Sequence, residues 1–208
     1  MKTLTSLVTA LVLICPALRG QNDPAILQDH DQHEGLLVAA DPYVDAARAK
    51  DKFGKNNPYA AGMLPVDLYF KNETDTPLRI NLKSVRLEVS QPGEDRDKVA
   101  ALSLQQVAVL IAHPEGARNP TVRRLPNPLP IPKNDKKEEK IVNALRPLAF
   151  DSDVLPPHST LHGFCFFDLS HDFDLTQYAT LYIPDVTIIP TNKPLMYFEV
   201  PLGSHADR

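Results

Sequence analysis

The chain has 208 residues, of which 43% are hydrophobic and 23% charged, and its formal net charge is −4. Such a composition is typical of one globular domain with its own core, and an acidic chain without a basic run is a poor candidate for binding nucleic acid or anionic membrane surfaces. Twenty prolines against eight glycines favour many strand ends and stiff connections over long helices.

Residues 1–20 have the features of a secretory signal peptide. Lys2 supplies the positive start, residues 7–14 the apolar run, and a break follows before Gln21. The run is short for a membrane span. Cys15 raises the alternative of a lipoprotein, which Ile14 disfavours because a lipobox needs a small residue before its cysteine. We therefore expect an exported chain, periplasmic or secreted, with no transmembrane span after cleavage.

Cleavage at this point would leave Cys165 as the one cysteine of the mature chain, so no intramolecular disulfide could form. This residue lies in an apolar stretch, Gly-Phe-Cys-Phe-Phe, where cysteine behaves as a small hydrophobe. A reactive thiol needs a neighbouring cation or a helix N-terminus, and neither is evident. We expect Cys165 to lie in the core.

The N-terminal third begins with a polar segment, residues 21–33, that we expect to be disordered. Residues 34–40 then read as a strand. Asp41 and Pro42 suggest the N-cap and first position of a helix that ends at Gly54. Its sheet-facing side chains would include Tyr43, Ala47 and Phe53.

Residues 64–70 show the alternation of a half-buried strand: one parity is apolar, and the other carries Asp67, Tyr69 and Lys71. A turn follows, and within it Asn72 begins a glycosylation sequon that has meaning only in a eukaryotic secretory route. Over residues 78–89 the apolar parity switches. A regular strand cannot do this, so we expect a bulge or corner at residues 83–84, where the strand passes between sheets.

The next part of the chain reads as two helices flanking a proline-rich insertion. Ser103 caps the first helix, residues 104–112, and the second starts near residue 135 with Ile141, Leu145 and Leu148 on one face. Residues 113–132 between them are extended or polyproline-like, either an exposed insertion or a docking segment for a partner.

The C-terminal part returns to strands over residues 159–169, 179–189 and 195–202, with Met196, Phe198 and Val200 expected to point inward. The sequence has no internal repeat and no alternation of strand and helix. It therefore predicts a mostly β, antiparallel β-sandwich of about seven strands, with two or three short helices in the connections. Residues 34–203 would form this single domain.

A resemblance supports this fold. The chain resembles uncharacterised exported bacterial proteins with an immunoglobulin-like sandwich, and is similar to accessory domains of the DUF4352 and FxLYD type. The similarity implies an envelope location and assigns no catalytic, cofactor-binding or metal residue. It rests on strand and turn residues over most of the mature chain: Phe53-Gly-Lys55, Pro58-Tyr59, Gly62-x-Leu-Pro-Val66, the segment from Pro156-Pro157 to Gly163-Phe164 with Phe167-Asp168, Tyr182-x-Pro184, and Phe198-Glu-Val200.

Histidines are the main candidates for chemistry. His30 and His33, flanked by acids, could clasp a transition metal if their frame were fixed. His158 and His162 are four residues apart, about 13 Å along a strand, and cannot chelate one ion unaided. His171 could join a site with acids in the following loop.

Enzymatic signatures are lacking: there is no Gly-x-Ser-x-Gly elbow, no His-Glu-x-x-His helix and no phosphate loop. We therefore expect an exported non-enzymatic domain that binds a protein or an envelope component. Its contact surfaces would be residues 113–132 and the strand edge near Asp67, Tyr69 and Lys71. The alternative is a periplasmic metal-binding protein that uses its surface histidines.

Overall fold

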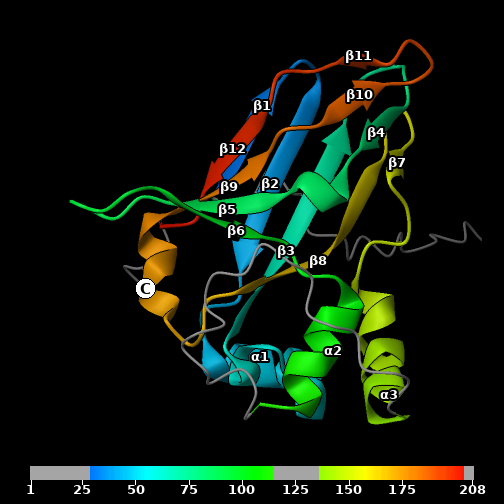
Figure 1. The fold of residues 1–208 in the computed structure, drawn as a ribbon. Coiled ribbons are helices and arrows are strands. Elements are labelled where there is room, and N and C mark those ends of the chain that lie inside the picture. Colours follow the sequence, from blue (N-terminus) through cyan, green and yellow to red (C-terminus); the bar gives the residue numbers. More distant parts are fainter. Residues whose placement is uncertain (1–28, 115–135, 204–208) are drawn as a thin grey trace, which may run out of the picture.

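The computed structural model describes residues 29–114 and 136–203 (Figure 1). The predicted signal peptide therefore lies outside the described residues, as do residues 21–28 of the segment expected to be disordered and residues 115–132 of the proline-rich insertion. Within the described ranges, no helix is long and apolar enough to cross a membrane.

The described residues form three antiparallel four-stranded sheets, so the prediction of a mostly β chain is confirmed. Sheet A has the order β1-β2-β3-β8, sheet B the order β11-β10-β4-β7, and sheet C the order β12-β9-β5-β6. The strands are β1 (His30–His33), β2 (Leu36–Pro42), β3 (Met63–Asn72), β4 (Leu78–Ile80), β5 (Arg86–Val89), β6 (Asp97–Ala100), β7 (Val154–Leu155), β8 (Thr160–Asp168), β9 (Ala179–Ile183), β10 (Val186–Ile188), β11 (Lys193–Pro194) and β12 (Phe198–Pro201).

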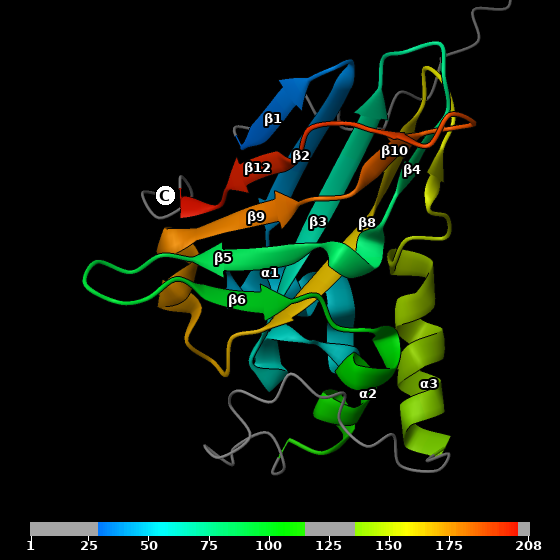
Figure 2. The same ribbon diagram turned by 45° about the horizontal axis from the view of Figure 1, so that its top comes forward.

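Sheets B and C form one bent layer that faces sheet A (Figures 1 and 2). The chain runs from β4 to β5, and from β9 to β10, across the bend. There Asn81 donates from its backbone N–H to the Asp185 carbonyl at 2.9 Å, and from its side chain to the Asp185 carboxylate at 3.1 Å. One hydrophobic cluster, which includes Leu68, Leu87 and Leu181, fills the space between the layers.

The opposite face of sheet A is covered at one end by helices. They are α1 (Ala46–Phe53), α2 (Leu104–Ala112) and α3 (Lys136–Leu145), gathered at the lower end in Figure 1. Phe164 and Phe166 of β8 and Met63 of β3 point to this side and form a second cluster with the helices. Sheet A is therefore buried on both faces where the helices lie.

Two of the helix starts show how local sequence determines the ends. Ser103 and Gln106 form a reciprocal capping box at the start of α2, as expected for a helix that begins at residue 104. The first helix starts later than predicted: Asp45 is its N-cap, and Asp41 and Pro42 end β2 instead. In that register Ala49 is buried and Ala47 exposed, so the prediction that Ala47 faces the sheet is wrong.

Other expectations differ in detail. The last four residues of the segment expected to be disordered form β1, which pairs with β2 from His30 to His33. The corner expected at residues 83–84 is the 3₁₀ turn η4 (Leu82–Ser84), and it lies at the bend between sheets B and C. The described residues contain twelve strands rather than about seven, since the bend and Pro184 each divide one expected strand in two, and β1, β7 and β11 were not foreseen.

Strand β8 is the edge of sheet A, and other segments contact that edge. A Cβ atom at Gly163 would lie 2.7 Å from the Phe150 backbone nitrogen, so only glycine allows this close approach. The Phe166 carbonyl accepts a hydrogen bond from the Leu102 N–H at 2.8 Å. The edge thus keeps its aromatic side chains without exposing its backbone.

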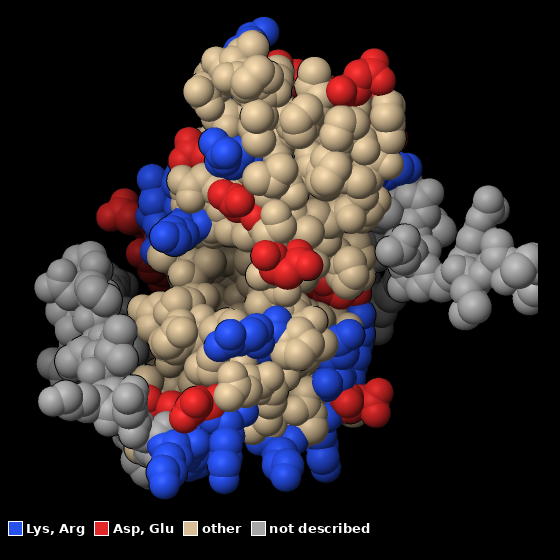
Figure 3. Space-filling model, turned by 90° about the vertical axis from the view of Figure 1, so that its right-hand side faces the viewer, with Lys and Arg blue, Asp and Glu red and all other residues tan. Residues whose placement is uncertain are grey.

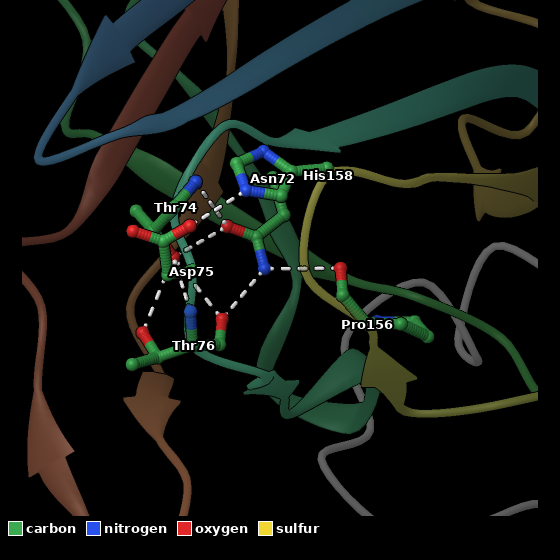
Figure 4. Close-up of polar contacts among 6 residues, drawn as sticks. All are labelled: Asn72, Thr74, Asp75, Thr76, Pro156 and His158. Carbon is green, nitrogen blue, oxygen red and sulfur yellow. Dashed lines mark hydrogen bonds and ion pairs between the residues drawn. The ribbon is translucent and has the colours of Figure 1, made fainter.

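Asn72 is the polar centre of the β3–β4 turn (Figure 4). Its side-chain amide donates to the carbonyls of Thr76 at 2.8 Å and Pro156 at 3.0 Å, and its oxygen accepts from the backbone and hydroxyl of Thr74. With 1% of its surface exposed, Asn72 links this turn to the segment before β8. The sequon asparagine is therefore not accessible to modification in the folded protein.

Replacement of Asn72 by alanine should lower the free energy of unfolding by about 2–3 kcal/mol, because it removes the hydrogen bonds that this buried side chain donates to the Thr76 and Pro156 carbonyls and accepts from Thr74. Chemical denaturation measures this change. Asp75→Ala is the matched control in the same turn, since it removes only the exposed contact between Asp75 and His158 (Figure 4). Equal midpoints for both variants would contradict a structural role for Asn72.

Candidate functional site

The outer face of sheet C carries a row of side chains from three neighbouring segments. Strand register places Arg86 of β5 opposite Tyr182 of β9. The Arg86 guanidinium carbon lies 4.2 Å from the centroid of the Tyr182 ring, and the ring centroids of Tyr182 and Tyr197 are 5.2 Å apart. We call Arg86, Tyr182 and Tyr197 the tyrosine–arginine ladder. Leu87 and Leu181, on the opposite parity, point into the core.

Glu88 holds the arginine of the ladder in place. Its Oε1 atom accepts from Arg86 Nε at 3.0 Å and lies 2.9 Å from Arg86 Nη2, while its Oε2 atom accepts from Arg96 at 2.9 Å. Burial alone would raise the pKa of Glu88, but these contacts with the two arginines outweigh it and lower the pKa. The carboxylate therefore stays ionised and keeps the Arg86 guanidinium flat over the ring of Tyr182.

The other end of the ladder is fixed by a seam between β1 and β12. The Glu34 side chain accepts from the Met196 N–H at 2.6 Å, and the Asp31 side chain accepts from the Glu199 N–H at 3.0 Å. His33 Nε2 lies 3.1 Å from the Tyr197 carbonyl oxygen, and its ring stacks on Phe198 with centroids 3.9 Å apart. Side chains of β1 thus hold the backbone that presents Met196 and Tyr197.

Met196 and Tyr197 are exposed hydrophobic side chains, with 60% and 47% of their surfaces accessible. The prediction that Met196 points inward is wrong, because β12 begins only at Phe198 and Leu195 is buried instead. Arg86, although 27% exposed, already has fixed partners. Side chains held in one conformation lose little entropy when a partner binds, so the ladder is suited to recognition rather than to chemistry.

A second polar cluster lies on the face of sheet A that bears the helices. Asp67 of β3 is 5% exposed; its Oδ2 atom accepts from the Tyr69 hydroxyl at 2.9 Å, and its Oδ1 atom lies 3.6 Å from His162 Nδ1. The rings of Tyr69 and His162 stack with centroids 5.2 Å apart. Burial raises the pKa of Asp67, an effect that Tyr69 and His162 offset in part. Burial and the nearby Asp67 carboxylate also raise the pKa of Tyr69.

An ion pair stands beside this carboxylate. Asp41 of β2 is the cross-strand neighbour of Asp67, and both oxygens of Asp41 accept from the Arg48 guanidinium. The Arg48 guanidinium carbon lies 3.8 Å from the centroid of the Tyr43 ring, and the bonds with Asp41 raise the pKa of Arg48. Asp41 is thus paired with Arg48, whereas at Asp67 the effect of burial outweighs those of His162 and Lys52, so its pKa lies above the ordinary value.

The structure does not support the predicted contact surface near Asp67, Tyr69 and Lys71. β3 lies in the interior of sheet A, between β2 and β8, so it presents no edge, and Asp67 is buried. Cys165 is in the core, as predicted: it points to the opposite face of the sheet, and burial, together with the Asp67 charge, raises the pKa of its thiol to about 12. A thiol in this state is a poor nucleophile.

The candidate histidines have separate partners. His158 lies 2.8 Å from Asp75, His162 pairs with Asp67, and the His171 ring packs edge-on to Phe173. His33 lies in the seam described above, on a strand that also contains His30. Across residues 29–114 and 136–203, no group of three His, Cys, Asp or Glu side chains is placed to hold a metal ion.

Two surface cavities lie away from both clusters. One, of about 320 Å³, is bordered mainly by acidic side chains of the β5–β6 hairpin and of the segment after β8. The other, of about 370 Å³, lies beside the stacked rings of Tyr59 and Phe173. Neither cavity contains Asp67, His162 or a residue of the ladder.

No protein-family model and no curated protein matches this sequence. The chain is similar to the crystal structure of a functionally unknown protein from Listeria monocytogenes EGD-e, with 12% sequence identity, a TM-score of 0.34 and 80% of each chain covered. A likeness of this size carries no argument about fold or function.

Sequence reasoning missed the ladder because its members come from residues 86, 182 and 197, which only sheet pairing brings together. The one available signal was the outward parity of Tyr182 and Tyr197. The burial of Asp67 was also missed. The alternation of residues 64–70 placed Asp67 on a polar face of its strand, whereas the structure buries that face.

Asp67→Asn should change how stability depends on pH. The raised pKa means that the folded state binds the proton of Asp67 more tightly than the unfolded state, so stability falls as pH rises from the ordinary value of 3.8 through the folded pKa. Asparagine carries no charge and can still accept from Tyr69. The stability of the variant relative to the wild type should therefore increase with pH over this interval. Urea denaturation over a pH series measures it, and a constant difference would contradict the argument.

Proposed function

We propose that this chain is an exported, non-enzymatic domain with an immunoglobulin-like β-sandwich fold that binds a protein partner in the cell envelope. The observation that carries the proposal is the tyrosine–arginine ladder, with the exposed Met196 at its end. Export is supported by the features of residues 1–20. Two antiparallel layers around one core support the sandwich. The resemblance to DUF4352 and FxLYD domains stays a prediction.

The residue types of the ladder fit a protein partner. Tyrosine, arginine and methionine are enriched at the centres of protein interfaces, and tyrosine and arginine dominate the residues that carry binding energy. Here Tyr197 and Met196 are exposed and adjacent, while Arg86 is already aligned by Glu88. A partner would bury apolar surface on Met196 and Tyr197 without having to order Arg86.

The alternative, a periplasmic metal-binding protein that uses surface histidines, has less support. His33, His158 and His162 each contact a different acid or backbone group. His33 also lies within 4 Å of the Asp31 and Glu34 carboxylates, but in the described part of the chain no three His, Cys, Asp or Glu side chains are placed to hold a metal ion.

Photo-crosslinking tests the ladder in the cells that produce the protein. A photoreactive phenylalanine analogue at Tyr197 should form a crosslinked product with one envelope protein, because this position would lie inside the interface. Tyr178, which is 38% exposed outside the ladder, is the matched control position and should give no such product. Identical patterns at both positions, or none at Tyr197, would sink the proposal.

Affinity gives a second measurement once the crosslinked protein is identified. Tyr197→Ala should weaken its binding about tenfold or more, as expected for a central interface tyrosine. Tyr178→Ala should leave the affinity unchanged. Both side chains are on the surface, so the variants should unfold at the wild-type temperature, and loss of binding without loss of stability assigns the effect to the interface.

Export predicts the N-terminus of the protein recovered from cells. Cleavage after Gly20 should leave a chain that starts at Gln21, and peptide mass spectrometry of the envelope fraction would identify it. A chain that retains residues 1–20, or one that carries lipid on Cys15, would contradict this part of the proposal.

A further inference from the structure

We propose that the helical end of the molecule is a docking surface for anionic phospholipid headgroups. The inference rests on the proposed export and adds a second surface, separate from the ladder. It revises the expectation, drawn from net charge alone, that anionic membranes are poor partners. The relevant feature is the location of charge within a chain whose formal net charge is −4.

Lysines collect on the segments that close this end. Lys50 and Lys52 lie in the last turn of α1, and Lys55 lies in the 3₁₀ turn η2 (Gly54–Asn56) that follows. Lys136 and Lys140 lie on α3, which contacts η2. All five side chains are exposed. We call these five residues the lysine end. Figure 3 shows Lys and Arg side chains in a row along the lower edge of the molecule, below the sheets.

These lysines are not used by the fold. Two neighbouring cationic side chains bind groups of the same chain: Arg48 pairs with Asp41, and Lys137 donates to the Ala112 carbonyl. By contrast, no ion pair to a residue of the described ranges involves any member of the lysine end. Lys52 alone has a described role inside the molecule: its ammonium lies 5.3 Å from the centroid of the Phe164 ring, and its charge helps to lower the pKa of Asp67. Their charges are thus available to a partner.

The acids at this end do not cancel the lysines. Asp45, the N-cap of α1, and Glu138, 3.2 Å from the His113 ring, each contribute one negative charge to these segments. Asp51 and Glu139 are exposed and remain as nearby negative charges. The lysine end therefore has more positive than negative charge, whereas the acidic side chains around the β5–β6 hairpin lie elsewhere.

The chemistry favours a lipid surface over other polyanions. Lysine is a flexible point charge without the planar fork that arginine uses to grip one defined phosphate. Several mobile ammonium groups at one end suit a fluid array of headgroups, and each adds roughly fivefold to partitioning onto an anionic bilayer. None of the exposed large hydrophobic side chains of the described residues, Tyr178, Met196 and Tyr197, belongs to α1, η2 or α3. Binding should accordingly be peripheral and sensitive to salt.

Vesicle flotation tests the proposal with residues 21–208, since the apolar run of residues 1–20 could insert by itself. The protein should float with vesicles that contain phosphatidylglycerol, should dissociate at high salt, and should not float with pure phosphatidylcholine. Reversing three charges with Lys50→Glu, Lys52→Glu and Lys55→Glu should lower partitioning by about a hundredfold or more.

The matched control reverses three charges at the other end of the molecule, with Arg79→Glu, Lys83→Glu and Lys193→Glu, which are exposed on β4, η4 and β11. It should keep wild-type partitioning. Equal losses in both triple variants would show an effect of net charge alone and overturn the proposal. Absence of wild-type flotation with phosphatidylglycerol would do the same, as would tighter binding of soluble polyglutamate than of vesicles.

The two proposals can fail separately. Tyr197→Ala leaves the lysine end intact and should bind vesicles like the wild type, while the lysine variants should keep the crosslink at Tyr197 in detergent extracts. Loss of vesicle binding in Tyr197→Ala would show that the ladder, not the lysine end, contacts the lipid.

Discussion

The structure depends on the burial of sheet A on both of its faces. Strands β3 and β8 pair over nine residues, with Leu68 and Phe70 packed against the second layer and Phe164 and Phe166 turned away from it. Aromatic side chains on that second face need their own cover. The chain supplies it with α1, α2 and α3, so the helices are a requirement of the sheet rather than additions to it.

Acidic side chains are accommodated in two different ways in this packed structure. Asp67 is buried on the face with the helices, next to the ion pair of Asp41 and Arg48, and its burial explains its raised pKa. At the β1–β12 seam, by contrast, the carboxylates of Asp31 and Glu34 accept hydrogen bonds from backbone N–H groups. The two strand edges therefore meet without the backbone hydrogen bonds of a paired sheet.

Several local features could be predicted from alternation, caps and turns. The inward residues of β3, the core position of Cys165, the caps of α2 and the turn near residues 83–84 follow from local patterns. Alternation failed at Met196, because a strand that starts at Phe198 does not extend its parity to earlier residues. The helix prediction failed at Ala47 because Asp41 lies in β2, and the side chain that accepts from the Arg48 N–H at the helix start is that of Asp45.

By itself the sequence determined the local features of this protein: its secretory leader as a prediction, its mostly β character, the N-cap of α2 and its lack of known catalytic motifs. These depend on side-chain periodicity and backbone preference within a few residues. Only the tertiary structure decided which distant residues meet. It brings Arg86, Tyr182 and Tyr197 together, and it groups lysines from α1, η2 and α3 at one end of an acidic chain. The physical reason is that such contacts are set by sheet pairing and by packing between segments that are separate in the sequence, which local preference does not encode.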